Sequence, residues 1–318
     1  MTLLPVQAAH ALPQLPEDGR WLIDGLWGDQ AVGIVGGEPK CCKSVLALDR
    51  AVAVAAGVPC LRRYSVVRPG RVLLFAAEDA LHIVRARLEG IGRAAGISLA
   101  DLDVQVITAP SLRLDLAADQ ERLTSTIAAL RPALLILDPF VRLHRIDENA
   151  SADVAPLLAY LRDLQGRFQL AVVVVHHARK GAAHLRAGQA LRGSSELHAW
   201  GDSNLYLRRH GPSLRLTIEH RAAAGHDGLG LELRACGDAL ALHLVDAGDG
   251  VDDREAARAP SRLEHVEQVL ATLATPITRR ELRRACHMRD SALGATLGQL
   301  LTTGRVVKSA AGYQIAHP

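Results

Sequence analysis

The amino-acid sequence predicts an α/β fold with a mainly parallel sheet, followed by a small C-terminal unit of a different kind. Strand-like apolar runs alternate with helical patterns between residues 31 and 175, which is typical of right-handed βαβ units. After residue 200 short strand patterns joined by Gly, Pro and Asp turns follow, and we expect them to extend the sheet in antiparallel fashion. Residues 247–260 are rich in Asp, Gly and Ala and predict a linker.

The expected organisation is an N-terminal arm, a core, this linker and a terminal domain, over residues 1–30, 31–246, 247–260 and 261–318. The arm has three Pro and two Trp. We expect it to be extended, to contain a short helix and to lie on a neighbouring surface. In the core the pattern predicts strand 31–37, helix 43–57, strand 71–77, helix 79–95, strand 104–107, helix 118–130, strand 133–137, helix 152–165 and strand 170–175. Later strands are expected at 205–207, 214–219, 229–234 and 240–244.

Composition excludes several classes of protein. With 49% hydrophobic and 22% charged residues, the 318-residue chain is not globally disordered. It has no apolar run long enough to cross a membrane and no signal-peptide pattern, so we expect a cytoplasmic protein with no membrane partner. The 5 Cys form no CxxC pair, which argues against a disulfide framework and a zinc site. The net charge of +3 comes from residues 251–318, with 10 basic and 7 acidic side chains.

A phosphate-binding loop is predicted between the first strand and the first helix. Residues 36–44 read GGEPKCCKS, and Gly37, Lys43 and Ser44 fit the pattern G-x-x-x-x-G-K-[ST]. In this pattern backbone N–H groups cradle the phosphates of ATP, the Lys reaches the β- and γ-phosphates and the hydroxyl holds Mg²⁺. The predicted nucleotide-binding residues are Gly37, Glu38, Pro39, Lys40, Cys41, Cys42, Lys43, Ser44 and Val45.

Two readings of this loop stay open. It could be a Gly-rich turn before an unrelated helix, because Cys42 stands where the pattern has its second Gly. The adjacent Cys41 and Cys42 could form a redox-sensitive pair or be two small loop residues. Only four Lys occur in the chain, and two of them, Lys40 and Lys43, lie in this loop, which favours the phosphate-binding interpretation.

Carboxylates follow two other predicted strands. Strand 133–137 runs into Asp138, the Walker B form, and beside the loop Asp138 would orient the water shell of Mg²⁺. The alternative is an ordinary strand that ends in Asp. Strand 71–77 runs into Glu78 and Asp79. We expect Glu78 to polarise the water that attacks the γ-phosphate and Asp79 to cap the next helix, unless both acids only cap it.

The strand 170–175 runs into His176 and His177 and then into a basic loop. A polar group at this strand end can sense the γ-phosphate, whereas the alternative is a pair of histidines satisfied at the strand end. Lys180, Arg186 and Arg192 in the loop suit a channel that grips single-stranded DNA by its backbone. With 3% aromatic residues, base stacking cannot be the main grip, so we expect sequence-independent, salt-sensitive binding.

Four segments of the chain resemble the RepA-type hexameric replicative helicases of plasmids, within the RecA-like ATPases. In the family's order, over roughly residues 30–210, they read VGIVGGEPKCCKSVLALDRAVAVAAG, RVLLFAAEDA, LILDPFVRLHRIDENAS and VVVHHARKGAAHLRAGQALRGSS. The resemblance implies a RecA-like P-loop NTPase core in a six-membered ring, with ATP between subunits and single-stranded DNA in the central hole. It also implies that Lys43 and Ser44 bind ATP and Mg²⁺, that Glu78 is the catalytic carboxylate, Asp138 the Walker B acid and His177 the sensor.

The resemblance leaves two residues open as the arginine finger that a ring subunit offers to its neighbour. Arg208 lies near the family's position, downstream of RGSS. Arg221, in IEHRA, stands where related ring helicases carry a basic pair, and we prefer it slightly. The departure of Cys42 from the family's pattern bears on the speed of turnover more than on ATP binding.

The terminal domain is expected to be a winged helix-turn-helix. Helical patterns cover residues 263–273 and 290–302, with Asp290 as the cap of the latter, and between them Thr278 and Glu281 form a capping-box pattern. Residues 304–308 and 312–316 predict a hairpin. From Pro276 onward there are seven basic and two acidic residues, which favours double-stranded DNA over the alternative, a protein partner. Lys308 on the hairpin would contact a phosphate.

The function expected from these motifs is an ATP-hydrolysing DNA-binding motor, a ring-shaped replicative helicase of a plasmid or mobile element that forms a hexamer. One alternative is a RecA-like ATPase that acts in recombination or loads a protein on DNA without processive unwinding. Another is a DNA-binding regulator whose nucleotide site is degenerate at Cys42.

Overall fold

A computed structural model of the chain describes residues 4, 6–12, 18–178, 195–210, 213–236, 239–245, 262–271, 275–286, 288, 290–309 and 311–316. The chain divides into two units, Met1–Ala247 and Gly248–Pro318, and each is described by itself. The predicted linker 247–260 lies outside the described residues. Among the helices of the described residues, none combines the length and the apolar character that a membrane span requires.

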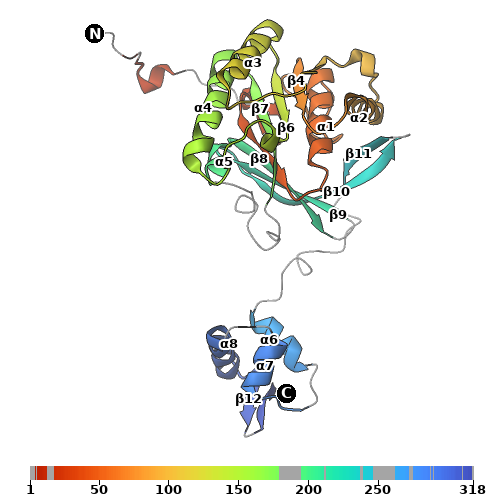
Figure 1. The fold of residues 1–318 in the computed structure, drawn as a ribbon. Helices are drawn as coiled ribbons and strands as arrows, with labels where there is room; N and C mark the ends of the chain where they lie inside the picture. Colours follow the sequence, from red (N-terminus) through yellow and green to blue (C-terminus); the bar gives the residue numbers. More distant parts are fainter. Residues whose placement is uncertain are drawn as a thin grey trace. The chain divides into compact units, whose positions relative to one another are not determined.

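The first unit is built on a nine-stranded sheet with the order β11-β10-β9-β8-β3-β7-β6-β4-β5 (Figure 1). Its strands are β3 (Val32–Gly37), β4 (Val72–Ala76), β5 (Val104–Val106), β6 (Leu134–Asp138), β7 (Ala171–His177), β8 (Ser203–His210), β9 (Ser213–His220), β10 (His226–Cys236) and β11 (Ala239–Leu244). The strands from β8 to β5 are parallel, whereas β9, β10 and β11 continue the sheet in antiparallel fashion. The predicted fold class and the antiparallel extension are both confirmed.

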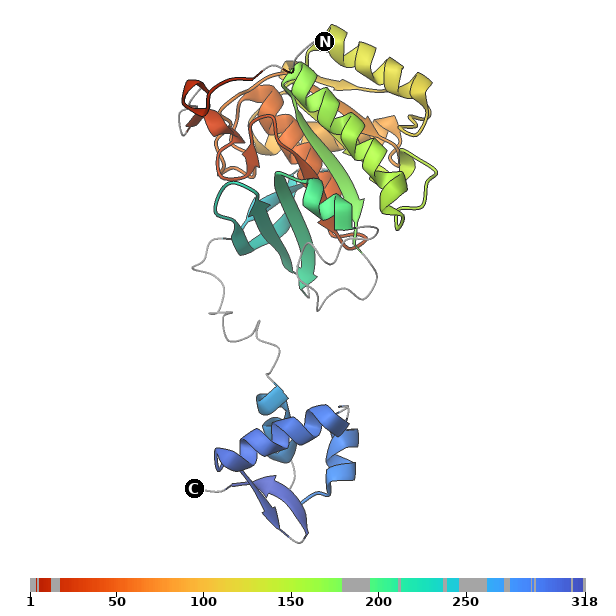
Figure 2. The ribbon, with the colours of Figure 1, turned by 90° about the vertical axis from the view of Figure 1, so that its left-hand side faces the viewer.

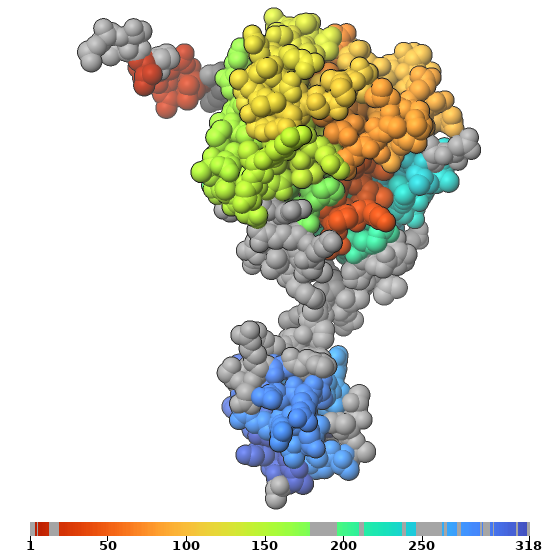
Figure 3. Space-filling model, in the orientation of Figure 1, coloured from red at the N-terminus to blue at the C-terminus, as the bar shows by residue number. Residues whose placement is uncertain are grey.

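Helices cover both faces of this sheet (Figures 1 and 2). They are α1 (Lys43–Ala56), α2 (Leu81–Ala94), α3 (Ala117–Leu130), α4 (Ser151–Phe168) and α5 (Ser195–Trp200), with short 3₁₀ turns η1 (Ala9–Ala11), η2 (Asp18–Arg20), η3 (Leu99–Asp101) and η4 (Phe140–Arg142). Side chains of α1 and α2 share one hydrophobic core, and those of α3, α4 and α5 share another. The helices α3 and α4 lie side by side at the surface, in yellow and green in Figure 3.

The central parallel strands β3, β4, β6 and β7 therefore bury both of their faces. In β3 Ile34 packs in the core of α3 and α4, while Val35 packs in the core of α1 and α2. A strand covered on both sides needs apolar side chains at every position. This is why the strands of this half of the sheet appear in the sequence as continuous apolar runs.

The N-terminal segment differs from the predicted arm. The strands β1 (Trp21–Ile23) and β2 (Trp27–Gly28) form a small antiparallel sheet. Leu22 and Trp27 are fully buried in the core that contains α1, and the guanidinium of Arg50 lies 4.6 Å from the Trp27 ring centroid. Large apolar side chains gain most of their stabilisation from such burial. The boundary predicted at residue 31 is therefore too late, because the core begins at Trp21.

The second unit contains three helices and a hairpin. They are α6 (Arg262–Ala271), α7 (Arg279–Ala285) and α8 (Asp290–Thr302), followed by β12 (Val306–Ser309) and β13 (Gly312–Ile315). The capping box is present: the Thr278 N–H donates to Glu281 Oε2 at 3.1 Å, and the Glu281 N–H donates to Thr278 Oγ1 at 3.4 Å. Leu282, Leu293, Leu297 and Leu300 belong to a separate buried core. The predicted elements of this unit are thus all found.

Candidate active site at the carboxyl edge of the sheet

Four neighbouring parallel strands, in the order β3, β7, β6 and β4, end at the same edge of the sheet. A pocket of about 310 Å³ lies there. Its lining includes Lys40, Cys41, Cys42, Lys43, Ser44, Val45, Ala76, Glu78, Asp79, Arg87, Asp138, Val175 and His177. The structure thus brings together most of the residues predicted to bind nucleotide with the three strand-end residues Glu78, Asp138 and His177. Gly37, Glu38 and Pro39 belong to the loop but do not line the pocket.

The backbone of the loop has the conformation that a phosphate-binding loop needs. Gly37 has φ +153°, and a Cβ there would lie 2.3 Å from the carbonyl oxygen of Leu207, so only glycine fits. Lys40 and Cys42 have φ of 63° and 66°, in the left-handed region. Cys42 immediately precedes α1. The turn thus exposes successive N–H groups at the N-terminus of a long helix, where an anion is favoured.

Lys43 lies inside this turn. Its side chain is 5% exposed, and Nζ donates to the carbonyl oxygen of Glu38 at 2.7 Å. Burial lowers the pKa of Lys43, and the Cys41 thiol group and Asp138 act in the opposite direction. The ammonium therefore lies at the N-terminus of α1, largely shielded from solvent. It is the positive charge that would contact the phosphate oxygens.

Asp138 and Ser44 provide oxygen atoms next to Lys43. Asp138 is 8% exposed, and burial raises its pKa to about 6, against the effect of a hydrogen bond from Ser44. Mg²⁺ binds through one or two protein oxygens, phosphate oxygens and water. Among the described residues no cluster of three or more His, Cys, Asp or Glu could hold a metal by itself. A hydroxyl and one buried carboxylate beside a phosphate-binding loop fit Mg²⁺ held jointly with a nucleotide.

Each acid that follows β4 is paired with an arginine. Arg142 Nε donates to Glu78 Oε1 at 2.9 Å, and Arg87 forms an ion pair with Asp79. The prediction that Asp79 caps α2 is wrong: the cap position is Ala80, and no side chain bonds there. Arg87 follows Asp79 by two helical turns and competes for its carboxylate. Sequence reasoning missed both arginines, and no local pattern links Arg142 to Glu78.

The two adjacent histidines point to opposite faces of β7. His177 lines the pocket, whereas His176 is 1% exposed and lies in the other face, with its ring centroid 5.8 Å from that of Phe140. Phe140 also contacts His144, whose Nε2 lies 3.4 Å from Glu148 Oε1. Sequence reasoning assigned no role to His144 and Glu148. Phe140, His144, Glu148 and His176 thus form a buried group on the face of β7 opposite to His177.

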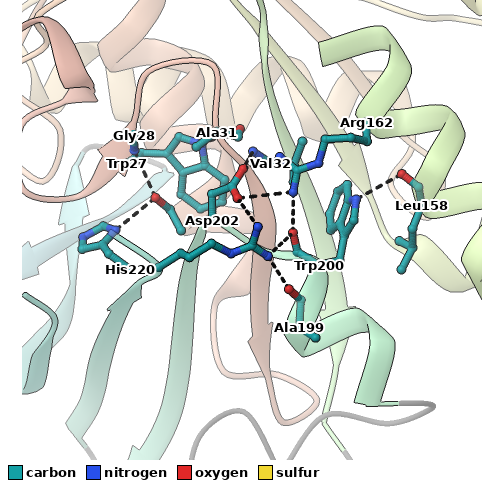
Figure 4. A network of polar contacts seen from close by, with 12 residues as sticks. Trp27, Gly28, Ala31, Val32, Leu158, Arg162, Ala199, Trp200, Asp202 and His220 are labelled. Atoms are coloured by element: carbon teal, nitrogen blue, oxygen red, sulfur yellow. Dashed lines mark hydrogen bonds and ion pairs between the residues drawn. The ribbon is translucent and has the colours of Figure 1, made fainter. Parts of the chain in front are cut away.

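The two arginine-finger candidates do not line the pocket. Arg221 follows β9 at the opposite edge of the sheet, because β9 runs antiparallel to β8. It is bound within its own chain: Nη1 lies 3.1 Å from Asp202 Oδ1, and Nη2 donates to the carbonyl oxygens of Ala199 and Trp200. Figure 4 shows Asp202 at the centre of this network, where Arg162 also binds it.

Arg208 lies on β8, one residue beyond the pairing of Leu207 with Gly37. The next residue, Arg209, reaches the loop itself, because its Nη2 donates to the carbonyl oxygen of Lys40 at 3.1 Å. This end of β8 is therefore at the pocket edge. Sequence reasoning missed Arg209, and only the pairing of β8 with β3 reveals it.

The predicted DNA-binding residues are only partly described. Lys180, Arg186 and Arg192 lie outside the described residues. Lys308 is exposed on β12 of the second unit, with Nζ 5.8 Å from the centroid of the Tyr313 ring.

Comparison with known proteins agrees with this geometry. Among solved structures the chain is similar to a DnaB-like replicative helicase that was described with its interactions with primase, with a TM-score of 0.50 and 12% identity. The match covers 67% of this chain and 57% of that chain, so this chain spans less than two thirds of it. At this identity the likeness shows the fold, a RecA-like P-loop core. A family model described as an AAA domain matches residues 2–183, more than half of the 318 residues, and the chain belongs to that family.

Proposed function

We propose that the chain is an ATP-hydrolysing DNA-binding motor, and specifically a ring-shaped replicative DNA helicase of a plasmid or mobile element. The observation that carries the proposal is the meeting of Lys43, Ser44, Asp138, Glu78 and His177 around one pocket at the carboxyl edge of the sheet. An anion-binding turn, two oxygen ligands, a further carboxylate and a polar strand end are the parts that phosphoryl transfer to water requires.

Each side chain has one task in this proposal. Bound Mg²⁺ neutralises charge that develops on the phosphate oxygens. Ser44 and Asp138 hold that ion, and Lys43 holds the phosphates by charge. Glu78 orients the attacking water and accepts its proton, for which its carboxylate must turn from Arg142 toward the pocket. His177 donates a hydrogen bond toward the terminal phosphate and reports its presence to the chain that follows β7.

Two parts of the chain are proposed to bind DNA, namely the segment after His177 and the second unit. Lys180, Arg186 and Arg192 follow β7 directly in the sequence and are proposed to grip single-stranded DNA in the centre of a hexameric ring. The helices α6 to α8 and the hairpin are proposed to be a winged helix-turn-helix, which has the element order of such modules.

The decisive experiment measures ATP hydrolysis with and without single-stranded DNA for the wild type, Lys43→Ala and Arg122→Ala. Arg122 is the control, because it is an exposed basic residue of α3 in the same unit that pairs with Asp119 and does not line the pocket. We expect DNA-stimulated hydrolysis that Lys43→Ala abolishes and Arg122→Ala keeps. Absence of Lys43-dependent hydrolysis would refute the proposal. Hydrolysis without displacement of a strand from a forked duplex would instead favour recombination or protein loading.

The same assay identifies the arginine finger. Arg208→Ala or Arg221→Ala subunits are mixed with Lys43→Ala subunits, each of which is inactive alone. If an arginine acts on the neighbouring subunit's ATP, mixed rings contain some complete sites and recover part of the hydrolysis. An arginine whose variant recovers nothing on mixing, and whose protein unfolds more easily, acts within its own subunit.

A further inference from the structure

The helix α7 carries the densest positive charge of the described second unit. It reads RRELRRA, and Arg279, Arg280, Arg283 and Arg284 are all exposed. At about 100° per residue, these four side chains spread over about 140° of the helix surface. The opposite side of the helix faces the core, where Leu282 is fully buried. The arginines therefore form one continuous basic face, which we call the α7 face.

Most of this charge forms no ion pair within the described residues of the unit. Glu281, the one acid of α7, is used in the capping box with Thr278. In the part of the chain that the structure describes, no ion pair joins a carboxylate to Arg280, Arg283 or Arg284. Cations in the first turn of a helix and like charges four residues apart both destabilise it. An arrangement that costs stability, and in which these three arginines have no ion pair among the described residues, suits a polyanion outside the unit.

In a helix-turn-helix, α8 would be the helix that reads the bases. It lacks the basic side chains that α7 carries. Its sequence DSALGATLGQLLT contains no Lys or Arg. Of the hydroxyls on its exposed surface, Thr302 Oγ1 is already bonded to the carbonyl oxygen of Gly298 at 2.9 Å. Gln299 is the one described exposed side chain of α8 with an amide that could read a base edge. The described side chains of α8 therefore offer few donors and acceptors for recognition of a base sequence.

The segment that leads into α7 lies next to the hairpin. Ile277, just before α7, pairs with Tyr313 of β13, and Tyr313 pairs with Lys308 of β12. The side chain of Arg279 reaches α8, since its Nη2 would lie 2.8 Å from a Cβ at Gly294. The basic face and the exposed Lys308 thus belong to adjoining segments of one small module.

We propose that the α7 face binds the phosphate backbone of duplex DNA and that the second unit reads no base sequence. Phosphate contacts fix position without carrying sequence information. Duplex is favoured over single-stranded DNA because Tyr313, the aromatic residue in residues 248–318, is 9% exposed and leaves no stacking platform. The inference rests on the proposed function only for DNA as the polymer, since this contact needs neither ATP nor a ring.

The test measures binding of the full chain to blunt-ended duplexes of several sequences without nucleotide, by fluorescence anisotropy across a salt series. The variant is Arg280→Ala/Arg283→Ala/Arg284→Ala. The control, Arg93→Ala/Arg122→Ala/Arg167→Ala, removes the same charge from exposed helix positions of the first unit, where each arginine pairs with an acid of its own helix. Loss of three phosphate contacts should lower the slope of log K against log salt by about 2.7 and weaken binding about 10²-fold near 0.1 M salt.

Two further variants separate the effect of charge from that of base recognition. A triple Arg→Lys variant keeps the charge, so it should bind duplex within a few fold of the wild type. Gln299→Ala should leave affinity and sequence dependence unchanged. An unchanged salt slope in the alanine variant, equal losses in the alanine and lysine variants, or sequence preference that depends on Gln299 would each overturn the inference. Lys43→Ala should not alter this binding, so failure of the ATPase proposal and failure of this one are separately visible.

Discussion

Replacement of Cys42 by glycine is the sharpest test of the loop geometry. Cys42 has φ 66° and ψ 24°, a left-handed conformation at the residue that precedes α1. Glycine adopts this region without a steric cost, whereas a residue with a Cβ does not. The phosphate-binding pattern has Gly at this position. The chain therefore carries local strain at the point where the phosphates would approach.

The expected size of the effect follows from two opposing contributions. Left-handed backbone costs a residue with a Cβ about 1–2 kcal/mol, which glycine recovers. Glycine also increases the freedom of the unfolded chain, which costs about 0.4–1 kcal/mol. We therefore expect Cys42→Gly to be more stable than Cys42→Ala by about 0.8 kcal/mol, and by about 1.6 kcal/mol at most. In ordinary right-handed backbone the order is reversed, because alanine is then favoured by about 0.5–1 kcal/mol.

Tryptophan fluorescence during urea unfolding measures this difference in the free energy of unfolding, and it reports on the first unit of the chain. The 3 Trp of the chain, Trp21, Trp27 and Trp200, all lie in the first unit. Gly57 provides the calibration, since it ends α1 with φ +68°, and Gly57→Ala should lower the free energy of unfolding by about 1 kcal/mol. If Cys42→Ala proves more stable than Cys42→Gly, the left-handed turn is refuted.

Three other outcomes follow from ion pairs. Asp202→Asn should lower the free energy of unfolding by about 2 kcal/mol in urea, because two arginines then face a neutral amide. Arg142→Ala should raise the rate of hydrolysis by no more than about fivefold and leave the Kd of ATP unchanged, since the exposed pair with Glu78 is weak. Arg113 holds the pKa of Asp115 at about 2, so Asp115→Asn should destabilise the protein at neutral pH. A folded-state pKa below the usual 3.8 stabilises above that value, so this difference should fade as pH falls from about 4 to about 2.

The residues at the carboxyl edge of the sheet could be predicted from the sequence, because the end of a strand is visible in the local pattern of apolar residues. Lys43, Asp138 and Glu78 each follow an apolar run, and the carboxyl ends of parallel strands meet at one edge. The neighbours of these residues could not be predicted. Arg142 reaches Glu78 over 64 positions and Arg209 reaches Lys40 over 169, and such pairs depend on the order of strands in the sheet.

The errors have the same origin. Asp79 has the residue type and place of a helix cap, yet Arg87 takes its carboxylate, because an ion pair with a side chain two turns away is better than a cap bond. The segment with Trp21 and Trp27 has no clear periodicity, so local patterns could not place it. Its burial against α1 is a tertiary effect that depends on a surface formed by the rest of the core.

The order of strands also bears on how ATP and DNA would be coupled. β7 lies between β3 and β6, so His177 lies between the phosphate-binding loop and Asp138. Two residues separate His177 from Lys180, the first residue proposed to hold DNA. A fully extended chain covers at most about 3.6 Å per residue, so a change at His177 reaches Lys180 through about 11 Å of covalent backbone. Coupling in the proposed motor would therefore need no relay through the core, because a shift of the end of β7 on loss of the terminal phosphate would move the proposed DNA contacts directly.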